Sequence, residues 1–334
     1  MEDRKKDHIE LAFKSQTNEL EHDRRFFYEP LLSPHPSKEK EIFSFLGKSL
    51  NTPIWVSSMT GGTSLARTIN ENIARVCKDF GMGMGLGSCR VLLDDDTFLK
   101  DFNVRAFIGD HLPFYANLGI AQVDFLLQRN ESEKIDRLID KLKADGLIVH
   151  VNPLQEWFQP EGNKIERAPI DIIEQLLKVA KYPIIVKEVG QGMGPKSLER
   201  LLQLPLQALE FGAYGGTNFS LLELFRADAQ VLDTFKPMAY IGQSALQMVD
   251  SINQLALKGD LRCNEIILSG GIKTFLDGYY LMEKSKLPAI YGMASSVLKH
   301  AKESYEQLYH FIELQQRGLQ LAKAYLRLNP DYHD

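Results

Sequence analysis

The stretch Gly146-Leu147-Ile148-Val149-His150-Val151-Asn152-Pro153-Leu154-Gln155-Glu156 carries the strongest indication of how this chain folds. Its first four residues form a short apolar run that predicts a buried strand, and polar residues follow where that strand should end. In parallel α/β proteins, ligand-binding side chains gather at the carboxyl ends of strands. A buried His, Asn, Gln and Glu without partners would be costly. We therefore expect a ligand, rather than the protein's own core, to satisfy them.

Outward from this stretch, short apolar runs alternate with segments of helical period along most of the chain. We expect strands at residues 53–57, 83–86, 114–117, 147–150, 184–187, 208–211, 266–269 and 289–292. Intervening helices are predicted at 65–80, with Thr63 or Ser64 as the N-cap, and at 135–142, 172–180 and 195–202. Eight such repeats predict an α/β fold whose parallel sheet closes into a (β/α)₈ TIM barrel. We expect residues 1–334 to form one domain, with 1–50 as an N-terminal extension and 296–330 as a closing helical segment.

The composition is that of an ordinary soluble globular protein and excludes several classes of function. Hydrophobic residues make up 44% of the 334 residues and charged residues 25%. The formal net charge of -5 argues against general nucleic-acid binding. No apolar run is long enough to cross a membrane, and the first residues lack the apolar region of a signal peptide. Cys77, Cys89 and Cys263 make no metal-binding pattern and fit a reducing compartment, so we expect a cytoplasmic protein.

Small and polar residues follow the other predicted strands as well. The segments concerned are Ser58-Met59-Thr60-Gly61-Gly62, Gly87-Ser88-Cys89-Arg90, Asn117-Leu118-Gly119, Lys187-Glu188-Val189-Gly190, Gly215-Gly216-Thr217-Asn218, Gly270-Gly271-Ile272-Lys273 and Gly292-Met293-Ala294-Ser295. Glycines allow a ligand to approach the backbone closely, and loops after strands seven and eight often bind phosphate in such barrels. Together they predict a ligand that carries a phosphate.

Each of these residues also has a structural interpretation that the pattern leaves open. Arg90 suits phosphate but also a surface salt bridge, and Asn117 suits a planar heterocycle but also a turn. Lys187 could contact an electron-rich ring or a phosphate, or form a buried pair with Glu188 or another carboxylate. The basic start of the chain, residues 4–8, is either a second anion site over the barrel mouth or a solvated terminus.

The same two interpretations apply to the first stretch. A lone His150 is more often a core histidine than a ligand-binding residue, and a lone Glu156 is more often a loop carboxylate than a metal ligand. Their crowding favours the functional interpretation. Mg²⁺ takes one or two carboxylates together with substrate phosphates, so a single Glu beside a diphosphate would meet its needs.

In these motifs the chain resembles the FMN-dependent type 2 isopentenyl diphosphate isomerases. His150-Val151-Asn152-Pro153-Leu154-Gln155-Glu156 matches the family's most specific motif, and Arg4-Lys5-Lys6-Asp7-His8-Ile9 resembles its N-terminal signature. Further matches occur in family order, at Met59-Thr60-Gly61-Gly62, Ala116-Asn117-Leu118-Gly119, Lys187-Glu188-Val189-Gly190, Gly215-Gly216-Thr217 and Ser269-Gly270-Gly271-Ile272. The resemblance extends from Arg4 to about Ala294.

The resemblance implies a barrel that binds FMN and interconverts isopentenyl and dimethylallyl diphosphate with Mg²⁺. The flavin would be reduced, usually by NADPH, and would act as acid and base through its N5. By similarity, the flavin would contact Met59, Thr60, Gly61, Gly62, Ser88, Asn117, Lys187, Thr217, Gly270, Gly271 and Ala294. The diphosphate would contact Arg4, Lys5, His8, Arg90, His150 and Asn152.

The resemblance also assigns roles to individual residues. Lys187 would favour the anionic reduced flavin, and Glu156 would bind Mg²⁺. Gln155 would lie near the allylic carbons of the substrate. Glu223 would be an auxiliary proton carrier, although a solvent-facing helix residue is the alternative interpretation. Family members are usually homo-oligomers, and the resemblance leaves open whether residues 1–8 act on their own or a neighbouring site.

Three positions depart from the family pattern. Cys89 stands where Gln is usual, Phe219 where Trp is common, and Lys273 where Arg is usual. Lysine keeps the charge of arginine but loses its bidentate fork, so Lys273 would hold the FMN phosphate differently.

Two other functions remain as alternatives. An FMN-dependent oxidoreductase of the 2-hydroxy-acid type would need a His base and an Arg in a segment that here reads Gly212-Ala213-Tyr214-Gly215-Gly216-Thr217. That segment has neither residue. A non-catalytic flavin- or phosphate-binding barrel would not require the cluster of His, Asn, Gln and Glu.

Overall fold

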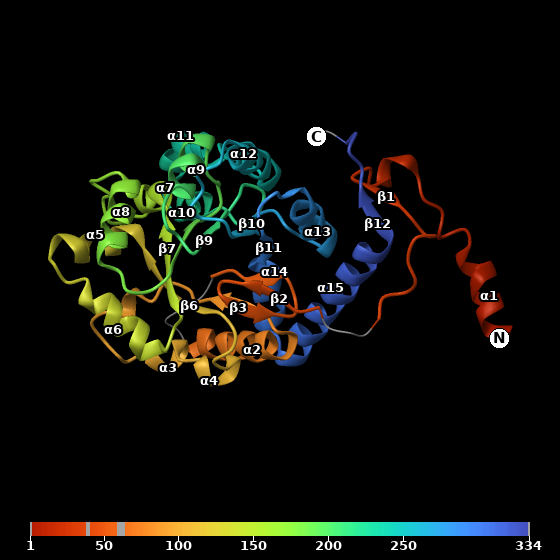
Figure 1. Ribbon diagram of the computed structural model, residues 1–334, viewed down its shortest axis with the longest axis horizontal. Helices are drawn as coiled ribbons and strands as arrows, with labels where there is room; N and C mark the ends of the chain where they lie inside the picture. Colours follow the sequence, from red (N-terminus) through yellow and green to blue (C-terminus); the bar gives the residue numbers. More distant parts are fainter. Residues whose placement is uncertain (1, 38–40, 59–63, 333–334) are drawn as a thin grey trace.

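A closed barrel of eight parallel strands lies at the centre of the molecule (Figure 1). The computed structural model describes residues 2–37, 41–58 and 64–332. The strands pair in the order β10-β11-β4-β5-β6-β7-β8-β9. They are β4 (Ile54–Val56), β5 (Gly83–Gly85), β6 (Phe114–Gly119), β7 (Gly146–Val151), β8 (Ile184–Glu188), β9 (Ala208–Glu210), β10 (Ile266–Ser269) and β11 (Ala289–Met293). The predicted (β/α)₈ barrel and its eight strands are therefore confirmed.

Helices connect the strands and cover the outside of the barrel. The four that the sequence predicts are present as α2 (Ser64–Phe80), α6 (Glu133–Leu142), α8 (Pro169–Val179) and α9 (Pro195–Leu202). Thr63 lies outside the described residues, and Ser64 is the first residue of α2. The others are α3 (Leu99–Phe102), α4 (Arg105–Ile108), α5 (Ile120–Gln128), α7 (Pro153–Phe158), α10 (Phe219–Arg226), α11 (Ala229–Ala239), α12 (Ala245–Lys258), α13 (Phe275–Lys284), α14 (Ser295–Ala301) and α15 (Tyr305–Tyr325).

Burial explains why the strands are short apolar runs rather than alternating ones. Helices cover their outer face and side chains fill the lumen, so strands such as β6 are buried at every position. Trp55 and Tyr115 fill part of the interior, with their ring centroids 6.1 Å apart in an edge-on arrangement. The amphipathic pattern of α6 behaves as expected, because the four apolar residues at helical spacing are its buried ones.

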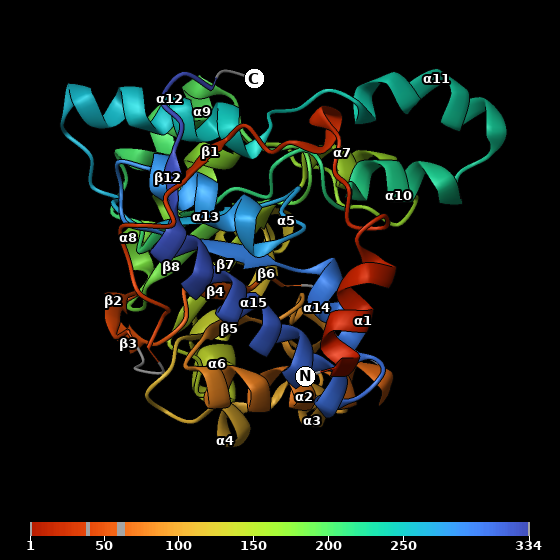
Figure 2. The same cartoon turned by 90° about the vertical axis from the view of Figure 1, so that its right-hand side faces the viewer.

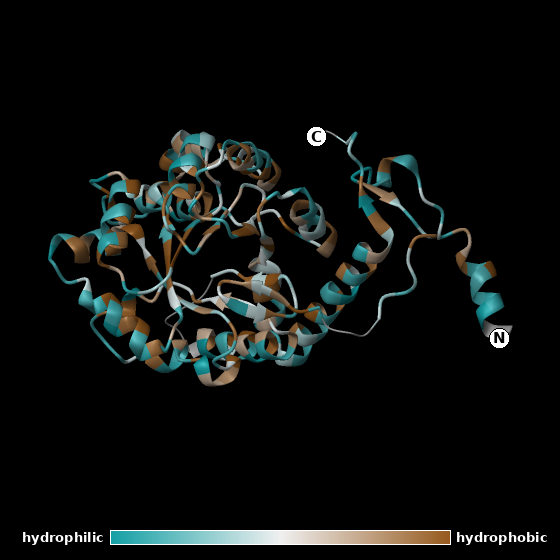
Figure 3. Cartoon of the chain, in the orientation of Figure 1, coloured by the Kyte–Doolittle hydropathy of each residue, from teal (hydrophilic) through white to brown (hydrophobic). Residues whose placement is uncertain are grey.

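Residues before the barrel form an arm that the apolar pattern does not predict in detail. The arm contains α1 (Glu2–Leu11), a 3₁₀ turn (Glu19–Glu21), β1 (Phe26–Tyr28) and a hairpin of β2 (Phe43–Phe45) and β3 (Lys48–Leu50). β1 pairs antiparallel with β12 (Leu326–Leu328), so the arm is fastened to the end of the chain. Figure 1 shows α1 standing off the barrel, on the far side of α15, and Figure 3 shows that helix as largely hydrophilic.

Across the described residues, no helix has the length and apolar character needed to cross a membrane.

Candidate functional site

A row of polar side chains crosses the carboxyl ends of β7, β8 and β9. The strand register pairs His150 with Lys187, and Lys187 with Glu210. Side chains that are paired in register on neighbouring strands point to the same face of a sheet, which here is the barrel lumen. The sequence places these residues on three separate apolar runs, and closure of the sheet brings them together.

His150 is held in this row by Asn117 of the neighbouring strand. Its Nδ1 lies 2.7 Å from Oδ1 of Asn117, whose Nδ2 donates to the backbone oxygen of Leu86 at 3.0 Å. Burial, together with the nearby Lys187 ammonium, lowers the pKa of His150 to about 3. The imidazole is therefore neutral at physiological pH and can donate or accept a hydrogen bond without adding charge.

Lys187 is buried at the barrel mouth but does not form the ion pair with Glu188 that the sequence left open. Its Nζ donates to the backbone oxygen of Glu188 at 2.9 Å. The Glu188 carboxylate instead accepts from the backbone N–H groups of Gly190, Gln191 and Gly192 at 2.7, 2.6 and 2.8 Å. Burial raises the pKa of Glu188, while these donors and Lys187 act in the opposite direction. The Glu188 carboxylate therefore holds the loop after β8 in place, and the Lys187 ammonium still has N–H groups that can donate to another acceptor.

The first turns of α7 bring Asn152, Gln155 and Glu156 together. Nδ2 of Asn152 donates to Oε1 of Gln155 at 3.1 Å and lies 3.3 Å from Oε1 of Glu156. These contacts follow from helical geometry, because residues three and four apart lie on one face. Glu156 also accepts from the backbone N–H of Asn163 at 2.7 Å, which closes the loop after α7.

Glu223 of α10 joins this cluster from a distant part of the sequence. Nε2 of Gln155 donates to Oε1 of Glu223 at 3.3 Å. Only 3% of Glu223 is exposed, so the interpretation as a solvent-facing helix residue is wrong. Arg226 donates to the other carboxylate oxygen at 2.6 Å and also pairs with Glu161 at 2.8 Å. The structure thus places the two predicted catalytic residues in contact.

These contacts give much of the polar stretch partners within the protein, and the expected ligand contacts stay a prediction. Protein groups partner His150, Gln155 and Glu156, and among the described residues only Oδ1 of Asn152 in this stretch is buried without a partner. A short helical segment lets neighbouring polar side chains bond to one another. The cluster is therefore held together by contacts within the protein.

Two adjoining cavities open at this end of the barrel. One has a volume of about 340 Å³ and is lined by Lys187, Thr217, Gly270, Gly271 and Ala294, which are five of the predicted flavin residues. The other has a volume of about 500 Å³ and is lined by Asn152, Gln155 and mostly apolar groups. Glu188 and Val189 line both, so a polar cavity rich in glycine lies next to an apolar one.

Gly270 shows why small residues are needed around the smaller cavity. Its φ is +92°, and a Cβ there would lie 2.1 Å from the backbone oxygen of Ala213. Gly271 also has a positive φ, and the loop continues to α13. The start of α14, at Ala294 and Ser295, lines the same cavity. Backbone N–H groups at helix starts and glycine loops are suited to a phosphate group.

Residues with unpartnered polar atoms line this cavity. Among the described residues, Oγ of Ser57, Oγ of Ser58 and both carboxylate oxygens of Glu210 are buried without a hydrogen-bond partner. Buried polar groups normally have partners, so these atoms indicate a polar ligand. A planar heterocycle with a phosphate, such as FMN, fits this combination of orphan polar atoms and glycine loops.

The side chains around Glu156 could hold a metal ion only if that ion takes most of its ligands from elsewhere. The described residues contain no group of three or more His, Cys, Asp or Glu side chains that could hold a metal ion. Glu156 is a single buried carboxylate beside Asn152. It therefore suits an ion such as Mg²⁺ that takes its remaining ligands from substrate phosphates and water.

Several other predicted site residues lie apart from this cluster. Arg4, Lys5 and His8 are exposed on α1, which stands off the barrel in Figure 1 and faces the viewer in Figure 2. Ser88 and Arg90 are exposed just after β5, and no ion pair of Arg90 occurs within the described parts of the chain. Met59, Thr60, Gly61 and Gly62 lie outside the described residues.

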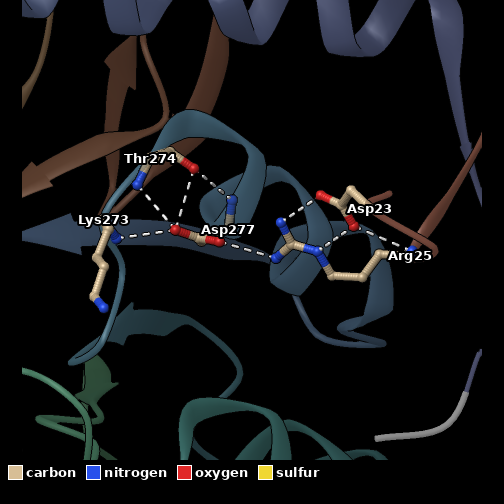
Figure 4. Close-up of polar contacts among 5 residues, drawn as sticks. All are labelled: Asp23, Arg25, Lys273, Thr274 and Asp277. Atoms are coloured by element: carbon tan, nitrogen blue, oxygen red, sulfur yellow. Dashed lines mark hydrogen bonds and ion pairs between the residues drawn. The ribbon is translucent and has the colours of Figure 1, made fainter. Parts of the chain in front are cut away.

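Lys273, which replaces the usual arginine, lies at the rim of the smaller cavity. Its backbone N–H donates to Oδ2 of Asp277 at 3.0 Å, and Figure 4 shows its side chain directed away from that carboxylate. Asp277 caps α13 through Thr274 and pairs with Arg25 of the arm at 2.9 Å. The cavity rim is therefore linked to the arm, a connection that the sequence pattern does not reveal.

Sequence reasoning missed Glu210 as a site residue. The sequence does contain an indication of this role. Glu210 lies in the buried run Ala208-Leu209-Glu210-Phe211, and burying a carboxylate costs much free energy unless a cation or a ligand lies beside it. Ser57 carries no comparable signal, because a serine at a strand end is also common in turns.

Comparison of the sequence with known proteins indicates the family of this chain, whereas comparison of the structure indicates only its fold. No family model matches the chain. The isopentenyl-diphosphate delta-isomerase of Rickettsia peacockii (strain Rustic) is 35% identical over 321 residues, which cover 93% of this chain and 90% of the relative. That of Rickettsia rickettsii (strain Sheila Smith) is 35% identical over 324 residues, with the same coverage.

Solved structures with a similar fold include the flavin-binding domain of baker's yeast flavocytochrome b2. It has a TM-score of 0.62 at 13% identity and covers 90% of this chain and 72% of that one. A flavocytochrome b2 double variant with sulfite bound has a TM-score of 0.61 at 14% identity and the same coverage. At such identities the likeness shows the barrel fold alone.

Proposed function

Because this chain belongs to the isopentenyl-diphosphate delta-isomerase family, we propose that it interconverts isopentenyl and dimethylallyl diphosphate with reduced FMN and Mg²⁺. NADPH is the proposed reductant of the flavin, and the cytoplasm, where the three buried free cysteines would stay reduced, is the proposed compartment. The observation that carries the proposal is the contact between Gln155 and Glu223 beside the larger of the two adjoining cavities.

The smaller cavity supports a role in holding FMN. Lys187, Thr217, Gly270, Gly271 and Ala294 line it, and its orphan polar atoms need hydrogen-bond partners. Ser88, Asn117 and residues 59–62 are the further proposed contacts. Reduced FMN would supply the donor and acceptor for the proton that the reaction moves. Lys187 would stabilise negative charge on the ring.

The substrate is proposed to lie between this cavity and the α7 cluster. Neutral His150, which neighbours Lys187 in the strand register, and the unpartnered Oδ1 of Asn152, which lines the larger cavity, are the proposed polar contacts. Arg4, Lys5, His8 and Arg90 are the proposed cationic contacts of the diphosphate. Glu156 would hold Mg²⁺ on that diphosphate.

Gln155 and Glu223 are the proposed residues next to the reacting carbons. Isomerisation adds a proton to the terminal alkene carbon and removes one from C2, so positive charge develops between these events. Apolar groups beside Gln155 would exclude water from that charge, and the Glu223 carboxylate, linked through Gln155, would stabilise it.

The proposal is tested by incubating the purified chain anaerobically with isopentenyl diphosphate, FMN, NADPH and Mg²⁺. Dimethylallyl diphosphate should be formed, and NMR or mass spectrometry detects it. Well-folded, flavin-loaded protein that yields no product would contradict the proposal. Reduction of the flavin by a 2-hydroxy acid would instead support the oxidoreductase alternative.

Glu156→Gln tests the metal site within this proposal. The amide keeps the size of the side chain but removes the anionic oxygen that Mg²⁺ prefers, so activity should fall at least 100-fold while bound FMN is unchanged. Activity measured against Mg²⁺ concentration checks the prediction. Glu166→Gln, an exposed change in the same loop, is the matched control and should leave activity unchanged.

A further inference from the structure

We infer that Glu210 is the counter-charge of Lys187 and that it sets the reduction potential of the flavin that Lys187 contacts. The inference extends the proposed function, because it rests on FMN occupying the smaller cavity. Glu210 would act as a positioning residue, through Lys187, rather than through the substrate.

The strand register places the two residues side by side. Lys187 of β8 pairs with Glu210 of β9, and both line the smaller cavity. Glu210 is fully buried and Lys187 is 7% exposed. Neighbouring strands fix this spacing, so the carboxylate remains next to the lysine whatever the loops above them do.

The partners of the two side chains are unequal. Lys187 donates to the backbone oxygen of Glu188, whereas neither carboxylate oxygen of Glu210 has a partner among the described residues. An ammonium group has three donors, so Lys187 keeps protons for a second acceptor. A buried carboxylate without partners is costly, and although the two side chains form no ion pair in the described structure, Lys187 is the cation that neighbours Glu210 in the strand register.

Other charged groups around the pair do not substitute for Glu210. The described charged residues that line this cavity, besides this pair, are Glu188 and Lys273. Three backbone N–H groups already bind the Glu188 carboxylate, and Lys273 lies at the rim. On the other side of Lys187, in β7, His150 is neutral at physiological pH. Glu210 is therefore the acid positioned to balance Lys187.

This arrangement has a consequence for the flavin. The Lys187 charge favours the anionic reduced form, and the Glu210 charge weakens that effect. At short range in a buried site such interactions are strong. Removing the negative charge should therefore bind reduced FMN more tightly relative to oxidised FMN and raise the reduction potential.

The test is the two-electron potential of FMN bound to the full chain, measured by anaerobic titration against reference dyes. Glu210→Gln should change the ratio of the oxidised to the reduced dissociation constants at least tenfold, which corresponds to about 30 mV in the positive direction. Lys187→Met should shift the potential negatively. In the Lys187→Met background, Glu210→Gln should shift the potential less, because only the direct action of the Glu210 charge on the flavin remains. Glu283→Gln, which removes an exposed charge on α13, is the control.

An unchanged potential in Glu210→Gln, or the same shift with and without Lys187, overturns the inference while leaving the proposed function intact. Failure of the wild-type chain to bind FMN is a failure of the proposed function instead. The pair is then tested without flavin, by urea unfolding of the two single variants and the double variant. Additive changes in unfolding free energy would show that Lys187 and Glu210 are not coupled, and would also overturn the inference.

Discussion

His150 illustrates how surroundings change the chemistry of a single residue. Its motif suggests a residue that binds an anion, and a histidine is charged below a pKa of about 6.5 in an exposed position. In the folded chain, burial and Lys187 lower that pKa to about 3, so the ring binds through a neutral hydrogen bond. Asn117 fixes its orientation from the next strand.

The lowered pKa predicts a dependence of stability on pH. Between the folded pKa of about 3 and the unfolded pKa of about 6.5, the unfolded chain binds more protons, so stability falls as the pH falls. His150→Gln should therefore lose less stability than the wild type between pH 7 and pH 5, as measured by urea unfolding. His111→Gln, at an exposed position, should lose as much as the wild type. Equal losses for His150→Gln and the wild type would contradict the lowered pKa.

The loop from β10 to α13 shows how an element is constrained by its neighbours. Gly270 has a left-handed backbone, and its missing side chain lets the β9 loop approach at Ala213. At the other end of the loop, Thr274 and Asp277 cap α13, and Arg25 binds Asp277 from the arm (Figure 4). The element is thus held from both sides.

Gly270→Ala should disrupt this loop. The added Cβ would lie 2.1 Å from the backbone oxygen of Ala213. This clash can be relieved only if the backbone at the ends of β9 and β10 moves. We expect a loss of several kcal/mol in unfolding free energy and at least 10-fold weaker FMN binding. Gly259→Ala is the matched control, since its φ of +83° is similar but nothing lies within 4 Å of the added Cβ. Its backbone conformation alone should cost about 1–3 kcal/mol, and an equal cost at both positions would contradict the packing argument.

At the scale of the whole molecule, pairing of β1 with β12 joins the arm to the chain end, and α1 extends beyond this sheet. Arg4, Lys5 and His8 are exposed on that helix and make no contact with the barrel in the described structure that would hold them at its mouth. The barrel core does not depend on α1, so folding and substrate binding can be separated by experiment.

Deleting residues 1–17 should leave the melting temperature and FMN affinity unchanged, because the deleted segment is exposed where described and lies outside the barrel. If its cations bind the diphosphate, KM should rise at least 10-fold with a smaller change in kcat. A variant that keeps α1 but carries Arg4→Gln, Lys5→Gln and His8→Gln should reproduce the rise. An unchanged KM in both would show that the arm is a solvated terminus.

The residue pattern alone was sufficient for the barrel, because eight buried strands alternating with helices leave few ways to bury their apolar faces. It was also sufficient to locate the α7 cluster, since Asn152, Gln155 and Glu156 are neighbours in sequence. It could not join Gln155 to Glu223 or Lys187 to Glu210, nor show that the protein satisfies most of the polar stretch. Those contacts depend on which strands and helices become neighbours when the sheet closes. The periodicity of a sequence indicates local structure but not the distance between residues that are far apart in the chain.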